Sequence, residues 1–270
     1  MRHLFKILSM FLFVSLPAAA EFWRFDAAVG SWNSAARGTI TETFNETLLL
    51  RDNIGSHKDK TAPYLYIVVR HPLPILPNLR LEYVDLKSSG TSVDVESLST
   101  TFPFDTINTT VTGVESELLL QQYDAILFYN LLDRAFWLTL DLGADLKYVI
   151  SRYTVDAAGY KEIELDEGSG SLIPMLYVRG RADLPLKGLG VEADGKFITD
   201  GSSTVYDIRL KADYTLDLFA LFKPGLELGY RIERIKVVGN QSDIIAPIIS
   251  GKTESDVTFS GLYGGVTVRF

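Results

Sequence analysis

Hydrophobic and polar residues alternate along most of this chain with the period of two that a β-strand gives its two faces. Between residues 136 and 150, Leu138, Leu140 and Leu142 share one face, and Asp141 and Asp145 share the other. The run is far longer than the usual strand of about five or six residues. It is long enough to cross a lipid bilayer when the strand is tilted.

The same alternation recurs and predicts about ten strands. They lie near 22–32, 62–71, 78–89, 114–130, 135–150, 171–183, 189–199, 202–216, 223–238 and 255–270. Short connections at 71–78, 131–134, 184–188 and 217–222 alternate with longer or polar ones at 33–61, 90–113, 151–170 and 239–254, apart from the tight Asp200-Gly201 turn. An open sheet edge is too costly in lipid. The pattern therefore predicts an all-β fold, a closed antiparallel up-and-down transmembrane β-barrel, with eight strands as the alternative count.

The first twenty residues predict a secretory signal peptide. Arg2 and Lys6 precede a short apolar run, and small residues lead to Ala20, as at a signal cleavage site. We therefore expect a signal peptide at 1–20 and an outer-membrane β-barrel at 21–270. The chain has no Cys and a net charge of −8, which argues against disulfides, thiolate metal sites and nucleic-acid binding.

Charged residues fall on the face of the strands that we expect to point into the barrel. Cations and carboxylates nearly balance there, and an unpaired buried charge is expensive, so we predict a paired charge network that fills the lumen. Its predicted members are Asp141, Asp145, Lys147, Arg179, Arg181, Asp207, Arg209, Lys211, Asp213, Glu227, Arg231 and Glu233. The alternative is an ion path or a polar conduit through the same residues.

Two further segments have distinctive patterns. The chain ends with Leu262, Val266, Val268 and Phe270 on one face, an ending similar to that of bacterial barrels whose last strand closes the sheet and is read by the barrel-assembly machinery. Ile244, Ile245, Ile248 and Ile249 make the connection at 239–254 unusually apolar. This connection either packs as the upper part of extended strands or forms an apolar mouth for a hydrophobic solute.

The sequence offers little for catalysis. A rim-located His–carboxylate pair would suit a barrel protease, but no His follows His71, and His71 enters a short turn. His57 follows Ser56 directly, and adjacent strand residues point to opposite faces, so the pair is a poor dyad. We expect no catalytic residues, no cofactor and no metal, and a hydrolase is the least favoured function.

The chain resembles, nearly end to end, a group of small Gram-negative outer-membrane proteins of unknown function that are related in architecture to OmpW-type and OmpA-like barrels. The matching segments are Gly30-Ser31-Trp32-Asn33, His71 to Asn78 followed by Leu81-Glu82-Tyr83, Gln122-Tyr123-Asp124 leading to Leu131-Leu132-Asp133, Pro174-Met175-Leu176-Tyr177, Tyr206-Asp207, Gly229-Tyr230-Arg231 and Phe270. This resemblance implies a monomeric barrel in the outer membrane and no particular activity. The OmpW likeness loosely suggests small hydrophobic cargo.

Together these patterns predict a non-enzymatic integral outer-membrane barrel. It is either a narrow, porin-like conduit for small solutes, hydrophobic ones included, or a structural, adhesin-like barrel that acts through its outer loops. The expected partners are outer-membrane lipid, lipopolysaccharide, the assembly machinery and a small solute, with no nucleic acid.

Overall fold

The computed structural model describes residues 23–44, 48–53, 58–73, 75–97, 110–135, 137–156, 163–166, 170–219, 221–238 and 252–270. The predicted signal peptide, His57 and the four isoleucines of the predicted apolar mouth lie outside these described residues. Over the described ranges, no helix has the length and hydropathy needed to cross a membrane.

All the regular secondary structure of the described residues is β-strand. Their bounds are β1 (Arg24–Phe44), β2 (Leu48–Asn53), β3 (Lys60–Arg70), β4 (Asn78–Ser97), β5 (Thr110–Ala135), β6 (Leu138–Asp156), β7 (Ile163–Asp166), β8 (Ser171–Asp183), β9 (Leu189–Thr199), β10 (Thr204–Thr215), β11 (Lys223–Val238) and β12 (Lys252–Arg269).

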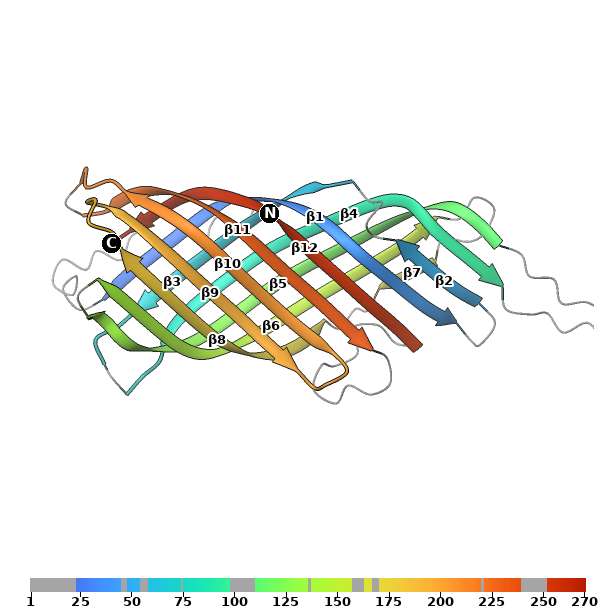
Figure 1. Cartoon of the computed structure of the whole chain (residues 1–270), viewed down its shortest axis with the longest axis horizontal. Helices are drawn as coiled ribbons and strands as arrows, with labels where there is room; N and C mark the ends of the chain where they lie inside the picture. Colours follow the sequence, from blue (N-terminus) through green and yellow to red (C-terminus); the bar gives the residue numbers. More distant parts are fainter. Residues whose placement is uncertain are drawn as a thin grey trace, which may run out of the picture.

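Ten of these strands close a barrel. Antiparallel pairing runs from β12 through β11, β10, β9, β8, β6, β5, β4 and β3 to β1, and β1 pairs with β12 from Asp26↔Arg269 to Thr43↔Lys252. The strands are strongly tilted, as a closed barrel requires (Figure 1). This confirms the predicted fold class and the count of ten rather than eight.

The two short strands extend neighbouring barrel positions. β2 pairs with residues 39–44 of β1 and 93–97 of β4. These residues lie beyond the region where β3 stands between the two strands. β7 pairs with β6 at Arg152↔Asp166, beyond the register of β8. Much of the predicted long connections at 33–61 and 90–113 is therefore strand, which extends one end of the barrel.

The two ends of the barrel differ. One end carries the C-terminus and the connections at 71–77, 184–188 and 216–222, and we call it the short-turn end (Figure 1). The opposite, long-loop end carries the extensions of β1, β4, β5 and β6. One tight turn also lies there, where Gly201 has a φ of 95° and Asp200 Oδ1 accepts hydrogen bonds from the N–H groups of Ser202 and Ser203.

His71 stabilises a turn at the short-turn end. Its backbone N–H donates to Asn78 Oδ1 over 3.1 Å, and its Nδ1 accepts from the N–H of Leu73 over 3.2 Å. Because Nδ1 accepts, Nε2 carries the proton and donates to the Pro77 carbonyl 3.0 Å away. Both ring nitrogens therefore hold the turn together.

Candidate functional site

The outer face of the barrel wall has an exposed apolar belt. Leu228 is 64% exposed, and Leu176 and Leu262 are similarly open, although each occupies a central position in its strand. A soluble protein rarely leaves so much contiguous apolar surface in water. The belt has the character of a lipid-facing surface, and it also includes Val29, Leu65, Leu127, Leu142, Val178, Ile208 and Leu226.

Toward the long-loop end the two faces exchange polarity. On β11, Arg231 and Glu233 point inward, but Ile235 and Val237 follow them on the inner face while Arg234 and Lys236 take the outer one. The same change occurs on β4, where Leu86 is buried and Lys87 is exposed. Above this level the barrel is built like a water-soluble one, with a polar exterior and a largely apolar interior in which the buried Asp52 accepts hydrogen bonds from Tyr153 and Ser116.

The inner apolar side chains at this end form what we call the apolar layer. Leu86, Tyr153 and Phe259 are each 1% exposed, so they are packed on all sides. Close packing of this kind leaves no aqueous path among them. The other members of the apolar layer are Ile40, Val84, Leu118, Leu120, Val149, Ile173, Val205, Ile235, Val237 and Val257.

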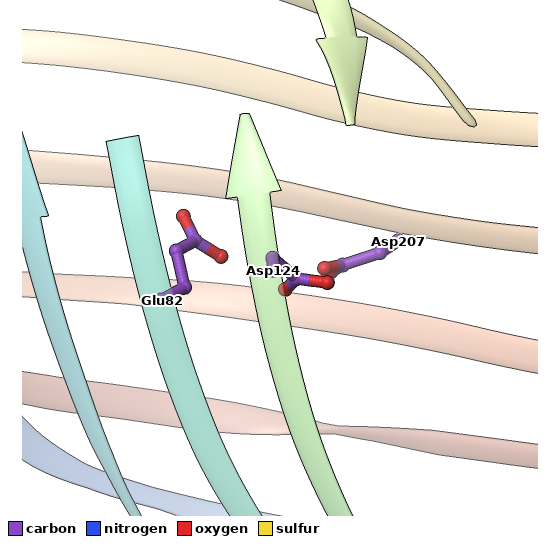
Figure 2. Close-up of side chains that lie close together, drawn as sticks. All are labelled: Glu82, Asp124 and Asp207. Carbon is purple, nitrogen blue, oxygen red and sulfur yellow. The ribbon is translucent and has the colours of Figure 1, made fainter. Parts of the chain in front are cut away.

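Beneath the apolar layer, a buried lysine joins carboxylates from distant strands. Lys196 Nζ lies 2.7 Å from Asp124 Oδ2, 2.8 Å from Glu82 Oε2 and 3.3 Å from Asp207 Oδ2. Figure 2 shows these three carboxylates, which come from β4, β5 and β10. We call Glu82, Asp124, Lys147, Lys196, Asp207 and Glu233 the central ion cluster.

The three carboxylates of the central ion cluster are also close enough together to be considered as ligands of a metal ion. The carboxylate oxygens of Glu82, Asp124 and Asp207 lie within 4.8 Å of one another, close enough for one ion. The Lys196 ammonium already contacts all three of them and supplies the positive charge that a metal ion would bring. Charge pairing within the chain accounts for the three carboxylates.

A second buried lysine extends the cluster across the barrel. Lys147 Nζ lies 3.0 Å from Glu233 Oε1 and 3.2 Å from Asp124 Oδ1, and Gln122 Oε1 accepts a hydrogen bond from it over 3.2 Å. Lys147 and Lys196 are 0% and 1% exposed. Two fully buried ammonium groups are tolerated only when they are paired and hydrogen-bonded, as they are here.

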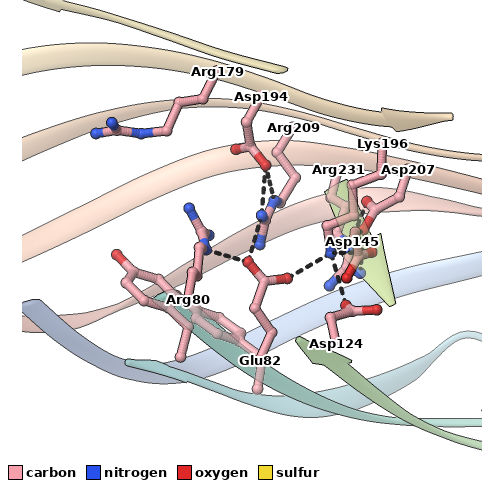
Figure 3. A network of polar contacts seen from close by, with 12 residues as sticks. Arg80, Glu82, Asp124, Asp145, Arg179, Asp194, Lys196, Asp207, Arg209 and Arg231 are labelled. Atoms are coloured by element: carbon pink, nitrogen blue, oxygen red, sulfur yellow. Dashed lines mark hydrogen bonds and ion pairs between the residues drawn. The ribbon is translucent and has the colours of Figure 1, made fainter. Parts of the chain in front are cut away.

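Arginines flank the central ion cluster (Figure 3). Arg231 holds Asp207 through two hydrogen bonds of 2.8 and 2.9 Å, and its guanidinium lies 4.7 Å from the ring centre of the buried Trp32. Arg209 donates to Asp194 and, over 2.7 Å, to Glu82. Bidentate pairs of this kind fix geometry as well as charge.

The network continues toward the short-turn end. Arg179 links Asp141 and Glu192 at 2.5 and 2.6 Å, and Arg181 is ion-paired with Asp213. Lys211 lies 2.9 Å from Glu227, whose two carboxylate oxygens also accept hydrogen bonds of 2.7 Å from the hydroxyls of Tyr64 and Tyr66. Ion pairs thus cross the lumen from this level to the central ion cluster.

The structure brings the twelve charged residues singled out in the sequence into one buried network. Asp145 is the least well satisfied of them: neither carboxylate oxygen has a hydrogen-bond partner, and its nearest ion contact is Lys196 at 3.9 Å. Glu82, Asp124 and Lys196 have the inward phase in the sequence but are not among the twelve predicted members, and the sequence analysis missed Tyr66 and the apolar layer. The signal for that layer was present, since Ile235 and Val237 continue the face of Glu233.

The C-terminal residues lie at the closing seam. Val266 and Val268 pair with Val29 and Ala27 of β1, and the backbone N–H of Phe270 donates to the Phe25 carbonyl over 2.9 Å. Leu262, Val266 and Phe270 are exposed on the outer face. The Phe270 ring lies 6.4 Å from that of Phe222, at the lower edge of the apolar belt.

These features define a class: a closed ten-stranded β-barrel with an apolar outer belt and a filled, charged interior. Comparison with solved structures gives the same fold. The outer membrane protease OmpT from Escherichia coli matches with a TM-score of 0.54 at 10% sequence identity, covering 92% of this chain and 97% of that one. At this identity the likeness concerns the fold alone.

Two other outer-membrane barrels match with lower scores. The translocator domain of the autotransporter NalP from Neisseria meningitidis has a TM-score of 0.39 at 12% identity, covering 98% of this chain and 92% of that one. A Pseudomonas aeruginosa FadL homologue has a TM-score of 0.29 at 8% identity, covering 93% and 90%. No family model and no curated protein matches the chain, so the OmpW-type resemblance gains no specific support.

Proposed function

We propose that this protein is an integral outer-membrane barrel that acts as a sealed, non-enzymatic scaffold and presents its long-loop end for surface interactions. The observation that carries this proposal is the filling of the lumen. The central ion cluster lies under the apolar layer, so a solute would have to cross both.

The outer surface supports membrane insertion. The apolar belt covers the middle of the strands, and outward charges such as Arg234 and Lys236 begin only above it. With the short-turn end in the periplasm, the extensions of β1, β4, β5 and β6 would rise above the outer leaflet, where lipopolysaccharide and other surface molecules are the expected partners.

Two considerations favour a scaffold over an enzyme or an open channel. His71 is the one histidine within the described residues, and both of its ring nitrogens make hydrogen bonds inside a turn at the short-turn end. Open porin channels belong to barrels of about sixteen or more strands, whereas ten leave an interior that side chains can fill. For a solute to pass through the barrel, the ion pairs of Lys196 and Lys147 would have to break and the side chains of the apolar layer would have to move apart.

Conductance of the purified barrel in planar bilayers tests this proposal. We expect no single-channel steps from samples that show heat-modifiable gel mobility, which reports a folded barrel. A porin of about sixteen strands in the same bilayers is the positive control, because it shows that the assay detects an open lumen. Reproducible single-channel steps from the wild-type barrel would contradict the scaffold proposal and favour the conduit.

The surface role needs its own test. Bacteria displaying the wild-type barrel should bind purified lipopolysaccharide or host-surface glycans more strongly than bacteria displaying a barrel whose connection at 98–109 is replaced by a short Gly-Ser turn. If the wild type and the variant are displayed at equal levels and bind equally, the connection at 98–109 is not part of the interaction surface.

A further inference from the structure

The connections at the short-turn end carry exposed apolar side chains. In the turn at 71–77, Ile75 is 85% exposed, and in the turn at 216–222, Leu221 is 77% exposed. Single exposed apolar residues are ordinary, but a group of them marks a surface that another molecule covers. We call this group the apolar rim, and its other members are Leu73, Leu76, Leu131, Leu132, Trp137, Leu184, Leu186, Leu218 and Phe219.

The apolar rim follows the circumference of the barrel. Its members come from the connections between β3 and β4, β5 and β6, β8 and β9, and β10 and β11. The seam between β12 and β1 continues the ring, because Phe25 and Phe270 are both exposed there. A protein that docks from the periplasm needs one patch on the turns, whereas the lipid of a membrane surrounds a barrel on every side. The ring therefore favours lipid as the molecule that covers it.

One of these turns is held against the outer wall of the barrel. The hydroxyl of Tyr129 donates a hydrogen bond of 2.9 Å to the carbonyl of Ile75. Tyr129 is exposed and shares the outer face of β5 with Leu127, a member of the apolar belt. The turn at 71–77 therefore lies beside the apolar belt, and the apolar rim and the apolar belt form one continuous surface there.

The strands that follow the two longest turns have short apolar runs on their outer faces. On β4 the run from Leu79 to Tyr83 ends before Asp85, and it spans about 10 Å along the barrel axis at the usual strand tilt. On β11 the run from Leu226 to Ile232 ends before Arg234 and spans about 15 Å. An outer-membrane barrel presents an apolar band about 25 Å tall. The apolar rim supplies the missing height beneath these two strands.

The charges within these turns are compatible with contact to phospholipid headgroups. Lys187 Nζ lies 3.1 Å from Asp217 Oδ2, and Lys223 Nζ lies 3.2 Å from Asp217 Oδ1, so two turns share one exposed ion-paired group. Leu186 and Leu218 are the direct neighbours of this group in the sequence. Long lysine side chains keep their charged ends in a polar layer while their stems lie along apolar surface. The charges can therefore stay among headgroups while the leucines contact acyl chains.

We propose that the inner leaflet of the membrane covers the apolar rim, so that the short turns lie at the boundary between acyl chains and phospholipid headgroups. This inference rests on the proposed function as an integral outer-membrane barrel and goes beyond it by assigning a partner to the short-turn end. Apolar groups at such a boundary are buried about 5–10 Å into the lipid. Turns anchored in this way would fix how far the long-loop end rises above the outer leaflet.

Depth-dependent fluorescence quenching tests this inference in phospholipid vesicles. The chain has no Cys, so a single cysteine can carry a fluorescent label at Ile75→Cys or Leu221→Cys. Phospholipids that carry a nitroxide should quench both labels several-fold more strongly than a label at Lys87→Cys, which lies on the outer face above the polarity change. Leu228→Cys, in the middle of the apolar belt, is the lipid-facing control. Heat-modifiable gel mobility shows that each labelled barrel is folded.

The position of the nitroxide on the lipid reports the depth of each label. A headgroup nitroxide should quench the labels at Ile75 and Leu221 more than the label at Leu228, and a nitroxide deep in the acyl chain should do the reverse. If both turn labels are quenched as little as the Lys87 label while the Leu228 label is strongly quenched, the inference is wrong. The integral-barrel proposal would then stand, and a periplasmic protein would become the partner of the apolar rim. Weak quenching of the Leu228 label as well would contradict membrane insertion itself.

Discussion

Lys196 Nζ lies 2.7 Å from Asp124 Oδ2, although the two residues are 72 positions apart and belong to β9 and β5. Their contact crosses the interior of the barrel rather than joining neighbouring strands, since β9 pairs with β8 and β10. A contact of this kind ties together two parts of the wall that β8 and β6 separate along the sheet. It is also what a permeating solute would have to break.

Removing this cation should strongly destabilise the barrel. Lys196→Met leaves three converging carboxylates without their shared partner, and breaking a buried ion pair costs about 3–5 kcal/mol. Urea unfolding in lipid vesicles, followed by tryptophan fluorescence, measures the free energy of unfolding. Lys187→Met is the control: Lys187 is 85% exposed, and its surface pair with Asp217 is worth about 0–1 kcal/mol.

A paired substitution keeps this prediction testable if Lys196→Met does not fold. Adding Asp124→Asn removes one of the stranded charges, so the double variant should recover part of the loss. A Lys196→Met barrel as stable as the wild type would show that the ion cluster does not hold the walls together.

The apolar belt predicts a depth-dependent cost for charge on the outer face. Leu228→Arg places a cation on the middle of β11, where an arginine facing lipid costs about 2–4 kcal/mol. Thr258→Arg lies on the outer face above the polarity change, beside Arg234 in the register, and should cost far less. Folding equilibria of both variants in the same vesicles make the comparison. Equal costs would place the membrane boundary elsewhere.

The apolar layer should behave like the core of a soluble protein. Phe259 is 1% exposed, and truncating such a residue to alanine costs about 3–5 kcal/mol. Phe197→Ala is the matched control, because Phe197 is 48% exposed on the outer face. Chemical denaturation of the two variants reports the difference. A small effect of Phe259→Ala would mean that the long-loop end is loosely packed.

The outer pair of Arg234 and Asp256 predicts a pH effect above the membrane. Arg234 donates two hydrogen bonds of 2.6 and 2.8 Å to Asp256, which hold the pKa of the Asp256 carboxyl below its ordinary value of 3.8. Because the folded-state pKa is the lower one, the pair stabilises the barrel above pH 3.8, and that stabilisation is lost as the pH falls through the lowered pKa. Both side chains are 37% exposed, so the effect is small.

Comparing the wild type with Asp256→Asn checks this pH dependence. The wild type should have the higher unfolding midpoint near neutral pH, and the difference should shrink as the pH falls below 3.8. The effect should also weaken at high salt, because exposed ion pairs are screened. A difference that persists at low pH would show that hydrogen bonding, and not charge, carries the contribution.

The alternation of residues was sufficient to predict the ten strands and their inward and outward faces. Strand register is specified wherever one face must be apolar, because a slip of one residue moves every side chain to the other face. The runs around Leu142 and Leu228 carry that information locally. The aromatic C-terminal strand likewise predicted the segment that completes the closure with β1.

The sequence did not predict the level along each strand at which the apolar residues turn from the outer face to the inner face. Ile235 and Val237 continue the inner face of Arg231 and Glu233, yet an apolar residue within a membrane strand is expected to face lipid. Only the position of the membrane boundary along the barrel separates the two interpretations. That boundary depends on how far β1, β4 and β5 extend, which the packing of the whole barrel sets.

The sequence by itself determined that this chain folds into a closed barrel and that charged side chains fill its lumen, because a period of two is a local property of the strand. Only the tertiary structure decided which charges meet across the lumen. Lys196 meets Asp207 as its register partner on the neighbouring strand β10, but it meets Glu82 and Asp124 because closure of ten tilted strands brings β4 and β5 within its reach. No spacing along the chain encodes a distance across the lumen.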